Sequence, residues 1–222
     1  MVIQAHHYSN KMSDILIYAG YFILTINLIL YLFSFFRKEK ANVFFIGYLA
    51  FAFIMQFIME VMYYLHMNNL FAVNIFFIGQ MIFLGLFYKS ILKSKKQKRF
   101  VKYSLITVLL ILTFQLILDY KEFLKFNLLG ITITSLLIVV FALFHFYNML
   151  THEKEYYYLN IGIFFYLFSS TILYLVGNLT SGLSDDVKYL SWNLNAILIL
   201  AYYFFILFEW KTRYNQTKKI NY

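Results

Sequence analysis

The chain has 222 residues, of which 62% are hydrophobic and only 13% are charged, and its mean hydropathy is +0.69. This composition lies outside the range of soluble domains and indicates a membrane protein. The absence of cysteine excludes disulfides, thiolate metal ligands and thiol nucleophiles. The net charge of +9 includes a basic stretch, residues 88–102, that is too short for a domain that reads bases. We therefore predict no nucleic-acid partner.

Seven apolar segments of about 18 to 26 residues follow one another, and a helix needs about 20 residues to cross a bilayer. Continuously apolar stretches such as SLLIVVFAL, residues 135–143, favour helices over the alternating strands of a membrane barrel. The segments are expected near residues 14–36, 42–67, 70–91, 100–119, 124–149, 157–178 and 189–210. The sequence therefore predicts an all-α fold, a single seven-helix transmembrane domain over residues 1–222.

The distribution of Lys and Arg predicts the orientation of this bundle. With the N-terminus outside, 15 of the 19 Lys and Arg residues fall on the cytoplasmic side and four on the outer side. Positive charge is enriched in cytoplasmic loops, so we expect the N-terminus outside and the C-terminus inside. The abundance of Phe, Tyr, Ile, Asn and Lys, which have AT-rich codons, indicates a low-GC bacterium. We predict a multi-pass protein of the inner (cytoplasmic) membrane, whose first partner is the lipid bilayer.

The stretch from Gln56 to Gln80 places polar side chains inside two apolar runs. Gln56, Glu60 and Tyr64 follow at i, i+4 and i+8, so they lie along one face of a helix. A carboxyl at membrane depth costs about 2.5 to 3.5 kcal/mol on insertion scales for an Asp-like group. Such a group normally turns toward protein or water. We therefore predict that Glu60 is the most consequential polar residue of the chain.

In the expected orientation, most polar side chains of the segments fall in the outer half of the membrane. They predict a partly hydrated cavity that opens to the outer side and is formed by the second, third, sixth and seventh segments. The candidate residues of this polar cavity are Gln56, Glu60, Tyr64, Asn74, Gln80, Gln115 and Asn195. We expect Asn74, Asn195 and Tyr64 to be neighbours of Glu60. Residues 108–112 and 136–140 should face lipid or apolar helix surfaces.

Several of these polar residues also have a purely structural interpretation. Glu60 could be protonated and hydrogen-bonded to an amide, and Asn127 could cap a helix. The series Asn195, Tyr202 and Glu209, at seven-residue spacing, is typical of helix packing. No HExxH motif is present, so we predict neither a metal nor a cofactor.

Three stretches of the chain resemble a known group of proteins. In EYYYLNIGIFFYLFSSTILYLVGN, four residues (Asn160, Gly162, Tyr166 and Ser169) have the spacing N-x-G-x-x-x-Y-x-x-S. This stretch resembles the sixth helix of small, uncharacterised seven-helix membrane proteins of Bacteroidota. SWNLNAILILAYYFFILFEW is similar to their last helix, and NNLFAVNIFFIGQ to their second turn and third helix. The resemblance extends over about residues 40–210.

The chain is also similar to the seven-helix input modules that precede bacterial sensor histidine kinases. That resemblance implies a sensory or accessory protein that binds a small ligand from the periplasmic side. The roughly 12 residues after Trp210 hold no kinase, so we expect the signal to pass to a separate cytoplasmic or membrane partner. A small-solute transporter or channel and an intramembrane lipid-modifying enzyme remain as alternatives. The enzyme is the weaker of the two, because no nucleophile or metal motif accompanies Glu60, His66 and Asp119.

Overall fold

The computed structural model describes residues 11–39, 41–179 and 185–214, and in these ranges it contains helices and no strand. The all-α prediction is confirmed for this part of the chain. Seven of the helices are long and apolar enough to cross a membrane, which indicates a multi-pass membrane protein. The helices are α1 (Lys11–Phe36), α2 (Val43–Tyr64), α3 (Leu70–Ile91), α4 (Lys95–Leu118), the short α5 (Tyr120–Phe123), α6 (Leu128–Asn148), α7 (Tyr157–Leu179) and α8 (Asp185–Tyr214).

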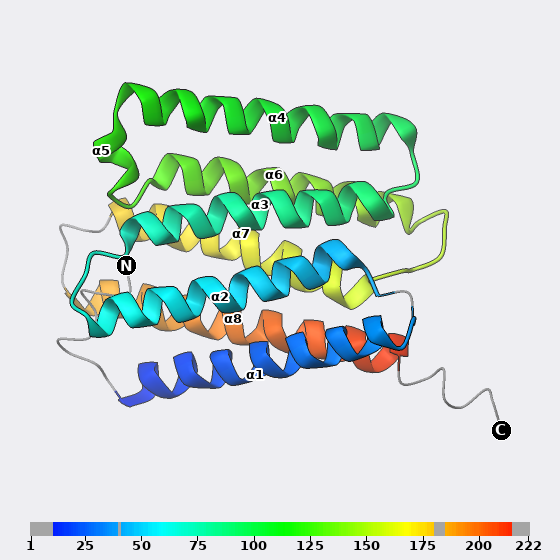
Figure 1. The fold of residues 1–222 in the computed structure, drawn as a ribbon, viewed down its shortest axis with the longest axis horizontal. Coiled ribbons are helices and arrows are strands. Elements are labelled where there is room, and N and C mark those ends of the chain that lie inside the picture. Colours follow the sequence, from blue (N-terminus) through cyan, green and yellow to red (C-terminus); the bar gives the residue numbers. More distant parts are fainter. Residues whose placement is uncertain (1–10, 40, 180–184, 215–222) are drawn as a thin grey trace.

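Six of the long helices form a closed ring. Around it, α1 packs on α2, α2 on α3, α3 on α6, α6 on α7, α7 on α8, and α8 returns to α1. The seventh, α4, lies outside the ring against α3 and α6 (Figure 1). Successive long helices run in opposite directions (Figure 1). We call the end where α1 begins and α2 finishes the Glu60 end, and the end that holds the turn between α3 and α4 the basic end.

Local sequence explains where several helices begin. The Asn42 side chain accepts hydrogen bonds from the backbone nitrogens of Phe44 and Phe45, at 3.0 and 3.3 Å, and so caps α2. Asn127 caps α6 in the same way through the Gly130 nitrogen at 2.9 Å, as the sequence predicted. The helix expected from residue 124 begins only at Leu128, because α5 and the turn after it occupy that stretch.

The interior of the ring is rich in aromatic side chains. The largest fully buried residues are Tyr31, Tyr48, Tyr88, Tyr202, Phe45, Phe87, Phe141, Leu24, Leu49, Met81, Leu84 and Leu92. By contrast, α4 buries only three side chains, Val101, Leu105 and Val108, and its Leu110 and Ile111 are exposed. The expected lipid-facing or apolar environment of residues 108–112 matches this peripheral position.

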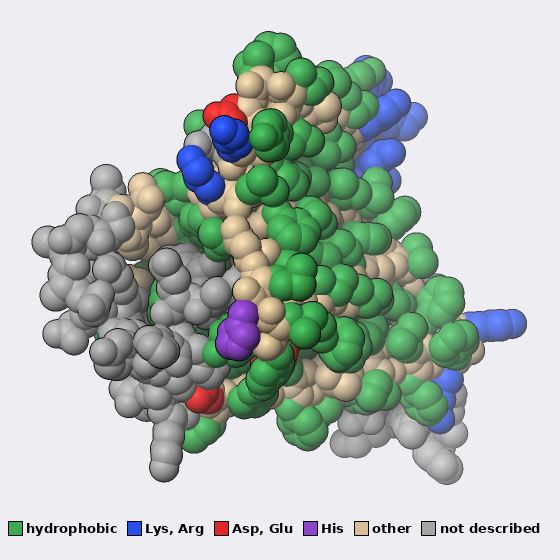
Figure 2. All heavy atoms as spheres, turned by 60° about the vertical axis from the view of Figure 1, so that its left-hand side comes forward, with side chains coloured by type: hydrophobic (Ala, Val, Ile, Leu, Met, Phe, Trp, Pro, Cys, Tyr) green, Lys and Arg blue, Asp and Glu red, His purple; other side chains and the backbone are tan. Residues whose placement is uncertain are grey.

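The surface separates apolar sides from a charged end. Hydrophobic side chains cover most of the helix sides in Figure 2, and most Lys and Arg side chains lie along its right-hand edge, toward the basic end. Exposed large hydrophobic residues occur on all seven long helices. A bundle with an apolar outer surface is suited to lipid, because it leaves few polar groups to be desolvated.

Candidate functional site

The seven residues predicted to form one polar cavity lie in separate parts of the bundle. Gln56, Glu60 and Tyr64 share one face of α2, as their spacing predicted, and meet α1 and α8. Gln80 is buried in the centre of the ring, and Asn195 lies half-buried on α8 beside Tyr174 of α7. The remaining two, Asn74 and Gln115, lie between α3, α4 and α6.

Glu60 is half-buried at its end of the bundle and is held by a phenol. The Tyr21 hydroxyl on α1 donates a hydrogen bond of 3.0 Å to Glu60 Oε2. Beside this pair, the hydroxyls of Tyr18 and Tyr64 lie 3.1 Å apart, and both of these tyrosines are largely exposed. Tyr64 is therefore a close neighbour of the Glu60 pair, and α1, which was not expected to line the site, supplies half of its polar groups.

Gln56 lies on the same face of α2 as Glu60, nearer to the centre of the ring. Its Nε2 donates a 2.8 Å hydrogen bond to the hydroxyl of Tyr203 on α8. The backbone carbonyl of Tyr203 accepts a 2.9 Å hydrogen bond from Asn27 Nδ2 on α1. Three helices therefore meet at Tyr203, one turn of α2 below Glu60.

A group of buried tyrosines, Tyr48, Tyr166, Tyr202 and Tyr203, continues this polar path, and we call it the tyrosine column. The rings of Tyr166 and Tyr202 are stacked with centroids 4.9 Å apart, and those of Tyr48 and Tyr202 are 6.5 Å apart. Gln80 Nε2 donates a 3.2 Å hydrogen bond to the Tyr48 hydroxyl. Gln80 thus has a defined partner inside the core rather than a place in an open cavity.

Asn74 has a structural role that the sequence did not suggest. Its Nδ2 donates to the carbonyls of Phe123 and Lys125, at 2.7 and 2.6 Å, and its Oδ1 accepts from the Asn127 nitrogen at 3.2 Å. Both polar atoms of the side chain are used to fix the turn between α5 and α6. The expectation that Asn74 is a neighbour of Glu60 has no support in their hydrogen bonds, because Asn74 bonds to the α5–α6 turn and Glu60 bonds to Tyr21 of α1.

Gln115 lies next to this turn, and its Oε1 accepts a 3.1 Å hydrogen bond from Asn127 Nδ2. Together with Asn74 and Asp119, these residues line a small cleft of about 20 Å³ between α3, α4 and α6. A volume of this size holds about one water molecule. The cleft is thus too small for an organic ligand in this conformation.

At the basic end, Glu209 of α8 contacts α7, which agrees with the helix packing that its seven-residue spacing predicts, and its role there is more specific. It is only 4% exposed, and its Oε2 accepts hydrogen bonds from the backbone nitrogens of Tyr158 and Leu159, at 3.0 and 3.4 Å. The carboxylate therefore caps the first turn of α7, where helix N–H groups lack partners. The isolated acid in a long apolar run was the available signal, but the partner's identity required the fold.

Tyr156, immediately before α7, adopts a left-handed backbone conformation with φ of 54°. The Arg213 guanidinium lies 3.9 Å from the centroid of its ring. Burial raises the pKa of the Tyr156 hydroxyl, and the Arg213 charge opposes that rise. The last two turns of α8 thus hold the start of α7 through both Glu209 and Arg213.

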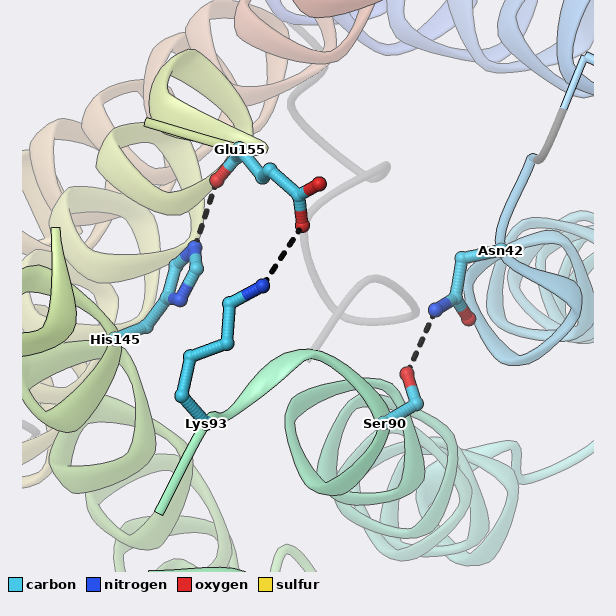
Figure 3. Close-up of polar contacts among 5 residues, drawn as sticks. All are labelled: Asn42, Ser90, Lys93, His145 and Glu155. Carbon is cyan, nitrogen blue, oxygen red and sulfur yellow. Dashed lines mark hydrogen bonds and ion pairs between the residues drawn. The ribbon is translucent and has the colours of Figure 1, made fainter. Parts of the chain in front are cut away.

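A second set of contacts at the basic end joins the turns between helices (Figure 3). His145 Nε2 lies 2.8 Å from the Glu155 carbonyl, so this nitrogen carries the proton, because a carbonyl only accepts. The Glu155 carboxylate lies 3.9 Å from Lys93 Nζ, and Asn42 Nδ2 donates a 2.7 Å hydrogen bond to Ser90 Oγ. These contacts link the α3–α4 and α6–α7 turns and tie the start of α2 to the end of α3.

The residues of the N-x-G-x-x-x-Y-x-x-S stretch are largely core residues. Asn160 accepts a 2.7 Å hydrogen bond from the Tyr88 hydroxyl and donates a 3.1 Å hydrogen bond to the Ala142 carbonyl. Gly162 allows α7 to approach α8, because a Cβ there would lie 2.7 Å from Phe205 Cβ. In this chain, packing therefore accounts for Asn160 and Gly162.

Comparison with known proteins gives no match to a family model, a curated protein or a solved structure. In the described ranges, no three His, Asp or Glu side chains gather as metal ligands. The arrangement at the Glu60 end, a half-buried carboxylate among phenols, is suited to binding a cation or a hydrogen-bond donor.

Proposed function

We propose that the chain is a sensory or accessory module of a bacterial cytoplasmic membrane, with the Glu60 end outside and the basic end in the cytoplasm. The orientation is supported by the 15 to 4 division of Lys and Arg residues. Basic residues of the α3–α4 turn and of the adjoining turns lie together at one end of the bundle (Figure 2). The basic end would then face anionic lipid head groups and a cytoplasmic or membrane partner.

The observation that carries the sensory proposal is the hydrogen bond between Gln56 and Tyr203. Gln56 shares the α2 face of Glu60, and Tyr203 belongs to the tyrosine column of α8. A change in the hydrogen bonding of Glu60 therefore has a polar route into the centre of the bundle. In general, two distant sites are coupled when the packed network between them can adopt two discrete arrangements.

The helix α8 provides the route from the centre to the basic end. Tyr203 meets Gln56, and Glu209, nearly two turns further along α8, caps the start of α7. A shift or rotation of α8 therefore alters the α7 cap and the adjacent turn that contains Glu155. A ligand at Glu60 would act by favouring one position of α8 over another.

The test uses the absence of cysteine, which makes any introduced cysteine unique. Lys154→Cys, in the exposed turn before α7, reports on the cap, and Lys96→Cys, on the peripheral α4, is the matched control. In lipid vesicles, Glu60→Gln should change the maleimide reaction rate at position 154 about fivefold and leave position 96 unchanged. The added substitution Tyr203→Phe should abolish the effect.

Equal reaction rates at position 154 with and without the Glu60→Gln substitution would contradict this proposal. A flux of solute across the vesicles that depends on Glu60 would contradict it as well and would favour a transporter.

A further inference from the structure

Four tyrosines on two helices lie at the Glu60 end, and one of them, Tyr21, donates to the Glu60 carboxylate. We call this group the tyrosine ledge: Tyr18, Tyr21, Tyr63 and Tyr64. Tyr18 and Tyr21 of α1 meet edge to face with centroids 6.1 Å apart. Tyr63 and Tyr64 of α2 do the same at 5.6 Å. The 3.1 Å contact between the Tyr18 and Tyr64 hydroxyls joins the two pairs across the helix boundary.

The electrostatic character of the ledge is negative. Glu60 Oε2 accepts from Tyr21, and no described Lys or Arg side chain forms an ion pair with Glu60. Asp14, in the first turn of α1, is a second acidic residue at this end of the bundle. The faces of aromatic rings add further negative potential, because the ring quadrupole attracts cations.

We propose that the tyrosine ledge and Glu60 bind an organic ammonium ion, with the carboxylate as counter-charge and the phenol rings as the surface for its alkyl groups. Aromatic side chains around a carboxylate are a recurring solution for ammonium groups. A bare Mg²⁺ or Ca²⁺ ion fits less well, because it needs about six or more oxygen ligands and one carboxylate supplies two. An anionic ligand would be repelled by the Glu60 charge, because no described Lys or Arg side chain forms an ion pair with this carboxylate.

The ledge is open enough to receive such a ligand. Tyr18 is 48% exposed and Tyr64 is 63% exposed, whereas Glu60 and Tyr21 lie deeper between α1 and α2. The opening is at the end of an apolar bundle, where a bilayer surface meets water. An ammonium group reaches it either on a lipid head group or as a free solute. This inference names the ligand class of the proposed sensory function. The effect of binding on α8 rests on that function, whereas binding itself does not.

The test measures choline binding to the full chain in nanodiscs of phosphatidylglycerol, a lipid that carries no ammonium. Titration calorimetry should give saturable binding of choline and no binding of its uncharged carbon isostere, dimethylbutanol. Glu60→Gln and Tyr64→Ala should each weaken choline binding about tenfold or more. Tyr103→Ala, a change at a similarly exposed tyrosine on α4, is the matched control and should bind as the unchanged protein does.

A second set of nanodiscs, with phosphatidylethanolamine added, distinguishes the two sources of the ammonium group. Competition between this lipid and choline indicates a head-group ligand, and unchanged choline affinity indicates a free solute. Folding of each variant is checked by its melting temperature. Equal binding by the unchanged protein and Glu60→Gln, equal binding of the uncharged isostere, or no binding at all would overturn the inference.

The two proposals can fail separately. If the protein binds choline but Glu60→Gln leaves the maleimide reaction rate at position 154 unchanged, the coupling through α8 is contradicted and the ammonium site stands. If Glu60→Gln changes the maleimide reaction rate at position 154 but the protein does not bind choline, the coupling through α8 stands and the ammonium site is overturned.

Discussion

The two ends of the bundle use the same side chain in opposite ways. Glu209 at the basic end is buried, and one of its oxygens accepts from two backbone nitrogens of α7. Glu60 at the other end is half-buried, accepts from the single hydroxyl of Tyr21, and lies beside exposed phenols. One carboxylate is committed to the fold, and the other has spare hydrogen-bonding capacity.

The difference shows that rarity in an apolar segment does not by itself mark a functional acid. Both residues interrupt long hydrophobic runs, and an acid is costly at either position. What separates them is the number and kind of partners that the fold provides. Substitutions of Glu209 should therefore lower stability more than ligand binding. Substitutions of Glu60 should lower ligand binding more than stability.

The largest effect on stability is expected from Glu209→Leu. This change leaves the Tyr158 and Leu159 nitrogens without their acceptor, and loss of a charged hydrogen-bond partner costs about 1.5 to 3 kcal/mol. Thermal unfolding in detergent should show a clear fall in melting temperature. Glu209→Gln keeps a carbonyl acceptor and should recover most of the loss. The comparison between the two ends fails if Glu60→Leu destabilises the protein as much as Glu209→Leu does.

A somewhat smaller effect is expected from Gly162→Ala at the α7–α8 contact. The added methyl group would lie 2.7 Å from Phe205 Cβ, an atom that no side-chain rotation can move. Overpacking costs about 1 to 3 kcal/mol, and improved helix propensity offsets up to about 1 kcal/mol of it. Gly20→Ala, near the Glu60 end, is the control, since its nearest atom is Tyr203 Cε2 at 3.9 Å. Equal melting temperatures for the two variants would contradict the close packing of α7 and α8.

The smallest effect concerns the link between the two ends. In a double-mutant cycle with Gln56→Leu and Tyr203→Phe, the coupling free energy should be about 0.6 kcal/mol, the average for hydrogen bonds between membrane helices. Each single change should also remove the response of the Lys154→Cys reporter to Glu60→Gln. Strictly additive stability effects together with an intact response would show that the signal takes another route.

Much of the fold could be predicted from the sequence, because lipid imposes a simple rule on length and hydropathy. Seven apolar runs of sufficient length specify seven helices whatever their neighbours are. The common face of Gln56, Glu60 and Tyr64 also followed from helical periodicity alone. Periodicity says nothing of which helix lies opposite, so it could not show that Tyr18 and Tyr21 of α1 meet this face.

The remaining polar residues were harder to place for the same reason. Asn74 and Gln80 are on one helix, yet the first holds the turn after α5 and the second meets Tyr48 in the core. Their partners come from other helices, and helix order around the ring is not encoded in any local pattern. A cavity inferred from depth in the membrane therefore combines residues that lie in four different places.

An external ligand reaches Glu60 only if the Glu60 end faces the outside of the membrane. Two single-cysteine variants test this directly: Met67→Cys, in the exposed turn after α2, and Lys96→Cys, at the basic end. A membrane-impermeant maleimide applied to intact cells should label position 67 and should label position 96 only after lysis. Labelling of position 96 in intact cells, with position 67 protected until lysis, would contradict the account.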